Sequence, residues 1–163
     1  MIFVTVGAQM AFDRLVRGVD EWAGARGRGA DVFAQIGPSD YRPHAIEWSG
    51  FLEPPAFRER VEAARAIVAH AGMGSILTAL ECGKPILVMP RRGALRETRN
   101  DHQVATAERF LSLGRVAVAM DETELPEKLD ALDDLTAGPA ISRHASERLI
   151  RTLRRFIFEG TGP

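Results

Sequence analysis

A glycine-rich loop that carries one histidine and one serine is the stretch of this sequence best suited to chemistry. Residues 66–69 form a short apolar run typical of a strand, and residues 76–80 show the apolar spacing typical of a helix. The intervening residues, His70-Ala71-Gly72-Met73-Gly74-Ser75, therefore form a strand-to-helix corner. Backbone N–H groups at the start of a helix lack internal partners and lie at the positive end of the helix dipole, so such a corner can hold a phosphate. Gly72 and Gly74 would let the anion approach the backbone, and Ser75 adds a hydroxyl.

The same residues could instead form a tight turn that binds nothing. In that interpretation Ser75 caps the helix and His70 is an ordinary residue at the end of a strand. A dinucleotide-binding fingerprint fits less well, because Leu77 stands where the third glycine should be and because this loop is not the first in the chain.

Two more segments carry polar groups at comparable places. Gly7 and Gln9 lie between an apolar run at residues 2–6 and a helical pattern at residues 12–23, and His102 and Gln103 open another helical pattern at residues 102–113. Residues 91–101 carry four arginines, which could attract a diphosphate or an anionic membrane surface, although we expect a solvated surface loop.

Side chains for metal or covalent chemistry are sparse in the sequence. The four histidines do not have the spacing of metal ligands, so we expect no metal. We also expect no cofactor. Cys82 has no base close to it in the sequence and is expected to serve in packing, and no serine has the context of a nucleophile elbow. The candidate site is therefore a binding site, and we assign no catalytic base.

Alternating strands and helices predict the fold that positions these residues. Apolar runs predict strands and periodic patterns predict helices between them, with strands at residues 2–6, 32–36, 46–51, 66–69, 86–89 and 116–120 and helices at 12–23, 57–64, 76–82, 102–113 and 125–135. This order is typical of an α/β fold, with a Rossmann-like parallel sheet that has helices on both faces. Gly7, His70 and Pro90 each follow a strand, so their loops should meet at one edge of the sheet.

Length and composition favour one domain, residues 1–163. A formal net charge of −1 argues against a nucleic-acid partner, and a single cysteine suits a reducing compartment. No apolar run has the length of a membrane span and the N-terminus does not look like a signal peptide, so we expect a soluble, cytoplasmic chain. An amphipathic helix is predicted at about residues 144–158, which could pack on its own domain or dock on a partner.

Several motifs, taken in order, resemble the C-terminal domain of glycosyltransferase family 28. They occur between residue 2 and about residue 119 and comprise Val4-Thr5-Val6-Gly7, Phe12-Asp13-Arg14-Leu15, His70-Ala71-Gly72-Met73-Gly74-Ser75, Gly83-Lys84-Pro85-Ile86 and Asp101-His102-Gln103. The resemblance implies one half of a GT-B glycosyltransferase. It is strongest to stand-alone chains that bind the sugar donor, act in N-glycan or bacterial exopolysaccharide synthesis, and work with a separate, membrane-associated subunit that binds the acceptor.

The resemblance also implies roles for individual residues. A UDP-sugar would place its diphosphate at Gly72, Gly74 and Ser75, near Gly7, and its sugar near His102 and Gln103. It implies an inverting, metal-independent transfer to a lipid-diphosphate-linked glycan at the cytosolic face of the membrane, with the general base supplied by the partner subunit.

Thr78 departs from the family pattern. Family members usually carry a glutamate six residues after the glycine that corresponds to Gly72, where it accepts hydrogen bonds from the ribose, and threonine cannot replace its charge. Such a loss would cost about 1.5–3 kcal/mol. Two alternatives to a catalytic subunit therefore stay open: a non-catalytic binding or scaffold module that has lost donor binding, and a nucleotide-binding enzyme that is complete by itself.

Overall fold

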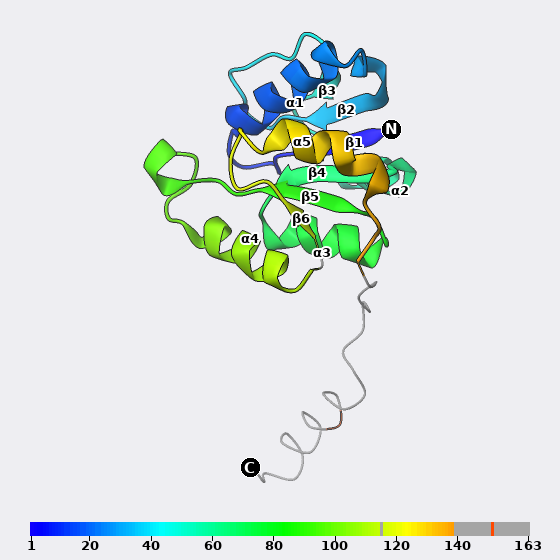
Figure 1. Cartoon of the computed structure of the whole chain (residues 1–163). Coiled ribbons are helices and arrows are strands. Elements are labelled where there is room, and N and C mark those ends of the chain that lie inside the picture. Colours follow the sequence, from blue (N-terminus) through cyan, green and yellow to red (C-terminus); the bar gives the residue numbers. More distant parts are fainter. Residues whose placement is uncertain (115, 139–150, 152–163) are drawn as a thin grey trace.

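The described part of the chain contains a parallel sheet with the strand order β3-β2-β1-β4-β5-β6 (Figure 1). The computed structural model describes residues 1–114, 116–138 and 151. Its strands are β1 (Ile2–Thr5), β2 (Val32–Gln35), β3 (Glu47–Ser49), β4 (Ala66–His70), β5 (Ile86–Met89) and β6 (Ala117–Val118). The chain runs outward from β1 to β3, returns to place β4 beside β1, and continues in the other direction. The carboxyl ends of β1 and β4 therefore flank the point at which the strand order reverses, where ligands bind in such sheets.

Helices cover both faces of the sheet. They are α1 (Asp13–Ala25), α2 (Pro54–Ala63), α3 (Met73–Glu81), α4 (His102–Ser112) and α5 (Leu125–Asp130), and 3-10 turns occupy Gly29–Asp31, Gly93–Leu95 and Ala131–Asp134. Figure 1 shows α1 and α5 on one face and α3 and α4 on the other. The Rossmann-like α/β prediction is confirmed.

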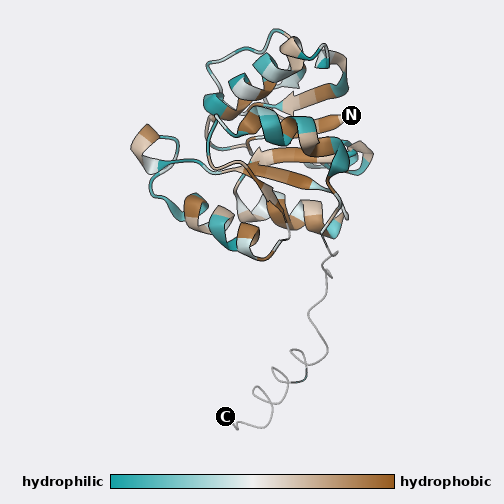
Figure 2. Cartoon of the chain, viewed as in Figure 1, coloured by the Kyte–Doolittle hydropathy of each residue, from teal (hydrophilic) through white to brown (hydrophobic). Residues whose placement is uncertain are grey.

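Two apolar cores explain why β1, β2, β4 and β5 are buried on both faces. Ile2 and Val4 pack into the core under α1 and α5, whereas Phe3 packs into the core under α2 and α3. Successive side chains of a strand point to opposite faces, so an uninterrupted apolar run supplies both cores. In Figure 2 the central strands β1, β4 and β5 are largely brown, and the helices carry both brown and teal residues.

Asp20 is a buried carboxylate in α1 that fixes the connection between β2 and β3. It is 4% exposed and accepts hydrogen bonds from the Tyr41 hydroxyl at 2.6 Å and from the amides of His44, Ala45 and Ile46 at 3.0, 2.8 and 3.2 Å. Burial opposes its ionisation, but these hydrogen bonds outweigh burial and lower the pKa of Asp20.

Several element boundaries differ from the predicted ones. The helix predicted at 57–64 begins at Pro54, since proline suits the first turn of a helix and has no N–H to leave unpaired. The strand predicted at 116–120 is reduced to Ala117–Val118, and the helix predicted at 125–135 changes to a 3-10 turn after Asp130. The predicted helix at residues 144–158 lies outside the described residues apart from residue 151.

None of the helices formed by the described residues combines the length and the apolar character that crossing a membrane requires.

Candidate functional site

A cleft of about 440 Å³ lies at the carboxyl ends of β1, β4 and β5. The loops that follow these three strands do meet at one edge of the sheet, as the sequence predicts, together with the start of α4. The cleft is lined by Val6, Gly7, Ala8, Gln9, Met10, His70, Gly72, Arg91, Thr98, His102 and Gln103. Six of the nine residues predicted from the sequence are therefore in one place: Gly7, Gln9, His70, Gly72, His102 and Gln103.

The loop after β1 turns sharply into the cleft at Gly7. Its φ of +76° lies in the left-handed region that side chains other than glycine avoid. The Gly7 amide donates to the Thr5 hydroxyl at 3.2 Å, which fixes the start of the loop. Ala8, Gln9 and Met10 are exposed, so this loop offers both backbone amides and the Gln9 side chain to a ligand.

The His70 imidazole packs between two glycines of the cleft. A Cβ added at Gly72 would lie 2.2 Å from its Nε2 atom, and a Cβ added at Gly7 would lie 3.1 Å from its Cε1 atom. Glycine at both positions is therefore what leaves room for the ring. Burial, with a smaller contribution from the positive charge of Arg91, lowers the pKa of His70 to about 4. The imidazole is neutral at pH 7, so it can donate a hydrogen bond to a ligand or accept one from it without adding charge to the site.

The first turn of α3 offers unpaired backbone donors. Gly72 is the N-cap, and no hydrogen bond among the described residues uses the amides of Met73, Gly74 or Ser75. The loop before it is held by hydrogen bonds from the Gly72 amide to the His70 carbonyl at 2.8 Å and from the Ala71 amide to the Met89 carbonyl at 3.1 Å. This helix start has the form of an anion site.

The structure places three predicted residues on α3 outside the cleft lining. Gly74 is exposed and Ser75 and Thr78 are half-buried, all within the helix. Ser75 is not the N-cap that the ligand-free interpretation required, because the helix begins two residues earlier, at Met73. The Thr78 hydroxyl donates to the Gly74 carbonyl at 2.8 Å, one turn back along the helix.

Arg91 departs from the expectation of a solvated arginine loop, whereas Arg96 and Arg99 are exposed as expected. Arg91 is only 5% exposed, and one of its terminal nitrogens donates to two carbonyls of the loop after β1, those of Val6 at 2.8 Å and Met10 at 2.6 Å. Its guanidinium also lies 5.2 Å from the centre of the Phe12 ring. Burial lowers the pKa of Arg91. A buried positive charge at the wall of the cleft favours an anionic ligand.

The start of α4 closes the cleft. Gln103 is 5% exposed and its side-chain oxygen accepts from the Arg91 amide at 3.2 Å, so this residue joins α4 to the segment after β5. His102 is exposed, its amide donates to the Asn100 side chain at 3.3 Å, and its ring Nδ1 contacts the same oxygen. Within residues 1–114, 116–138 and 151, no group of three or more His, Cys, Asp or Glu side chains could hold a metal ion.

Sequence reasoning missed Arg91, Thr98, Val6, Ala8 and Met10. Arg91 carried a usable signal, since it follows a buried strand in the same way as Gly7 and His70. That place after a strand distinguishes it from the exposed Arg96 and Arg99 of the same segment, but nothing in the local sequence indicates that its side chain is buried.

Two comparisons with solved structures agree with this architecture. The NMR solution structure of ALG13 superposes with a TM-score of 0.59 at 21% identity, covering 97% of this chain and 94% of that one. The crystal structure of the glycotransferase of kitacinnamycin gives a TM-score of 0.56 at 25% identity, covering 93% of this chain and 38% of that one.

A relative in sequence is the UDP-N-acetylglucosamine transferase subunit ALG13 of Eremothecium gossypii. It is 37% identical over 103 residues, which cover 59% of this chain and 49% of the relative. The chain thus spans about half the length of the relative that it matches. The model of the glycosyltransferase family 28 C-terminal domain matches residues 1–148, a range that contains every residue of the cleft, and the chain belongs to this family.

Proposed function

We propose that this chain is the donor-binding subunit of a two-component glycosyltransferase that uses a UDP-sugar. Membership of the family and the name of the relative, a UDP-N-acetylglucosamine transferase subunit, support the donor class. In this proposal a separate, membrane-associated subunit binds the acceptor, a lipid-diphosphate-linked glycan of polysaccharide synthesis such as an exopolysaccharide. That subunit brings the present chain to the cytoplasmic face of the membrane.

The single observation that carries the proposal is the composition of the cleft. The hydrogen-bonding side chains of Gln9, His70 and His102 lie beside the buried guanidinium of Arg91 and next to the unpaired amides at the start of α3. A diphosphate matches the charge and the amides, and a sugar matches the directional side-chain groups. In the proposed pose the diphosphate lies between Gly7 and Gly72, and the sugar lies toward His102 and Gln103.

The proposed reaction is a single displacement with inversion. An acceptor hydroxyl attacks the anomeric carbon, the bond from that carbon to the diphosphate oxygen breaks, and UDP leaves with the bonding electrons. A base of the partner subunit takes the hydroxyl proton. Arg91 and the amides of α3 are placed to stabilise the charge that develops on the leaving diphosphate, so we propose that transfer needs no metal, which activity in the presence of EDTA would test.

One observation favours a second candidate, a binding module that no longer uses a donor. The Thr78 hydroxyl is already bonded to the Gly74 carbonyl, at the position where the family carries a ribose-binding glutamate. We expect Thr78→Glu to strengthen UDP binding by about 10- to 100-fold if the site has only lost this contact. No gain would mean that the nucleoside is held in another way. Thr106→Glu on α4, which also replaces a threonine bonded one turn back, is the control for added charge.

Titration of the chain with UDP, followed by amide NMR shifts, tests the proposal directly. We expect shifts at Gly7, at Gly72–Ser75 and at His102 and Gln103. Uridine and inorganic diphosphate, titrated separately, divide the effect between the nucleoside and the anion. Absence of shifts at these amides, together with absence of sugar transfer when the membrane partner is present, would contradict the proposal.

A further inference from the structure

The segment between β5 and α4 forms one wall of the cleft but has little regular structure of its own. It contains only the 3-10 turn at Gly93–Leu95, after which Arg96 has a positive φ of +58°. Arg91 and Thr98 from this segment line the cleft, and its end leads into His102 and Gln103. A segment with so little regular structure needs contacts from elsewhere to keep these side chains in place.

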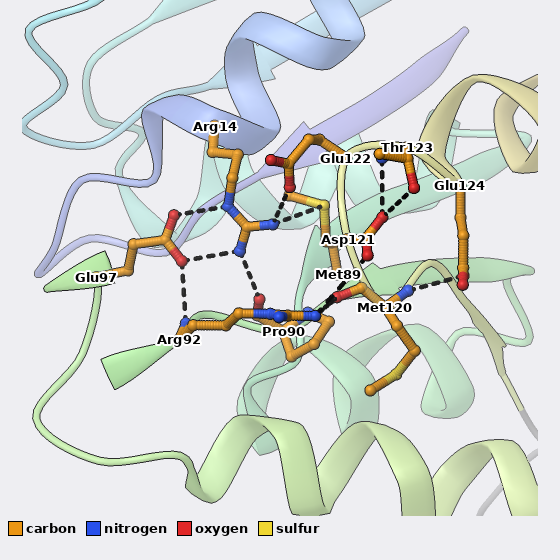
Figure 3. Close-up of polar contacts among 10 residues, drawn as sticks. All are labelled: Arg14, Met89, Pro90, Arg92, Glu97, Met120, Asp121, Glu122, Thr123 and Glu124. Carbon is orange, nitrogen blue, oxygen red and sulfur yellow. Dashed lines mark hydrogen bonds and ion pairs between the residues drawn. The ribbon is translucent and has the colours of Figure 1, made fainter. Parts of the chain in front are cut away.

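Arg14 of α1 supplies such a contact through Glu97 (Figure 3). Its Nε donates to one Glu97 oxygen and a terminal nitrogen donates to the other, both at 2.9 Å. The same terminal nitrogen donates to the Pro90 carbonyl at 3.1 Å. The side chains of Arg14 and Glu97 are 13% and 12% exposed. A bidentate ion pair that is largely shielded from water has a specific geometry, unlike most ion pairs at the surface.

Glu97 also binds its own segment. The oxygen that accepts from the Arg14 terminal nitrogen accepts from the Arg92 amide at 2.9 Å. The carboxylate therefore joins both ends of the stretch from Arg92 to Glu97 to α1. Arg91 and Thr98, the two residues that line the cleft, are the immediate neighbours of this stretch.

All three guanidinium nitrogens of Arg14 have hydrogen-bond partners within the protein. Its remaining terminal nitrogen donates to Glu122 of the β6–α5 loop at 2.7 Å, and Glu97 raises the pKa of Arg14. It is not among the residues that line the cleft. Its effect on a ligand must therefore pass through the segment that it holds.

We propose that Arg14 and Glu97 are positioning residues of the donor site, which hold Arg91 and Thr98 at the wall of the cleft. The proposal rests on the proposed function, since it concerns the same UDP-sugar site. Through Arg91, whose guanidinium holds the carbonyls of Val6 and Met10, the ion pair also acts on the loop after β1.

Glu97→Gln tests the proposal, because it keeps the shape of the side chain and removes its charge. We expect UDP, titrated against the full chain, to bind on the order of tenfold more weakly. The matched control is Glu122→Gln, which changes the other carboxylate on the same guanidinium but lies on an exposed loop outside the segment, with a side chain that is 52% exposed. It should bind UDP as the wild type does.

A double-mutant cycle tests whether Arg14 and Glu97 act together on UDP binding, and stability measurements on the same variants separate positioning from loss of fold. If Arg14 and Glu97 act as one unit, Arg14→Lys combined with Glu97→Gln should weaken UDP binding no more than the stronger single variant. Urea denaturation of the same variants reports stability separately. A purely structural pair would lower stability and leave the UDP dissociation constant of the folded protein unchanged, which would overturn the proposal.

Amide spectra without ligand keep the test independent of the proposed function. Glu97→Gln should shift the amides of Ala8, Gln9 and Met10, which are far from the substitution in sequence, whereas Glu122→Gln should not. If the wild-type chain binds no UDP and transfers no sugar when its partner is present, the proposed function fails, and these spectra still decide the role of Glu97. Unchanged amides in that loop, or equal effects of the two variants, would overturn the inference.

Discussion

Replacing Gly72 by alanine should destabilise the fold by crowding one side chain, the imidazole of His70. The added Cβ would lie 2.2 Å from Nε2 and 2.7 Å from Cδ2 of this ring. The ring would have to withdraw by about 1 Å to restore ordinary contact, and Gly7 already packs against its Cε1 atom.

The magnitude follows from two opposing terms. Overpacking of a buried site costs about 1–3 kcal/mol, and the loss of backbone freedom in the unfolded chain returns about 0.4–1 kcal/mol. Since Gly72 has an ordinary extended φ of −90°, no backbone strain adds to these terms. We expect a net loss of about 1–2 kcal/mol in the free energy of unfolding, or about 2–8 °C in Tm.

Gly74→Ala is the matched control, because a Cβ there meets nothing within 4 Å. This variant should gain about 0.5 kcal/mol, as expected for alanine replacing an exposed helical glycine. Urea denaturation with unchanged m values measures both variants. In a His70→Ala background, Gly72→Ala should lose its cost. Equal stability of the two alanine variants would refute the packing argument.

Two further predictions concern titratable groups. Asp20→Asn should cost about 1.5–3 kcal/mol at pH 7, because the amide cannot accept all four hydrogen bonds that Asp20 accepts. The pKa of Asp20 is lowered in the folded state, so its contribution to stability is complete above about pH 4 and is lost as pH falls through the folded pKa. The difference in stability between Asp20→Asn and the wild type should therefore shrink at low pH. A constant difference down to pH 2 would contradict this. His70, followed by NMR, should titrate near pH 4, and UDP should raise its pKa because the anion favours the protonated ring. A midpoint near 6.5 without ligand would show that the ring is solvated.

The sheet and its glycine loops follow from local patterns, whereas the wall of the cleft does not. Apolar runs such as Ile2–Thr5 indicate buried strands because both faces need apolar side chains, and Gly7 and Gly72 mark corners that only small residues allow. The sequence could therefore place two loops of the site.

The burial of Arg91 could not be predicted from its neighbours. Arginine is rarely buried, and the carbonyls that satisfy it belong to Val6 and Met10, far away in the chain. The same holds for Glu97, whose partner Arg14 lies in α1. Helix ends are hard to predict for a different reason, because they depend on local backbone geometry. The sequence makes Ser75 a plausible N-cap of α3, but the helix begins at Met73 with Gly72 as its N-cap.

The order of the strands has a consequence for how the molecule assembles. β2 is the next strand after β1 in the chain, whereas β4, the other neighbour of β1, follows only after β2, β3 and α2. Arg91 then meets the Val6 carbonyl across a separation of 85 residues. Closing long loops costs entropy before their contacts form, so the nascent chain should acquire its first half-sheet early. The charged wall of the cleft would be completed late, when β5 has docked against β4.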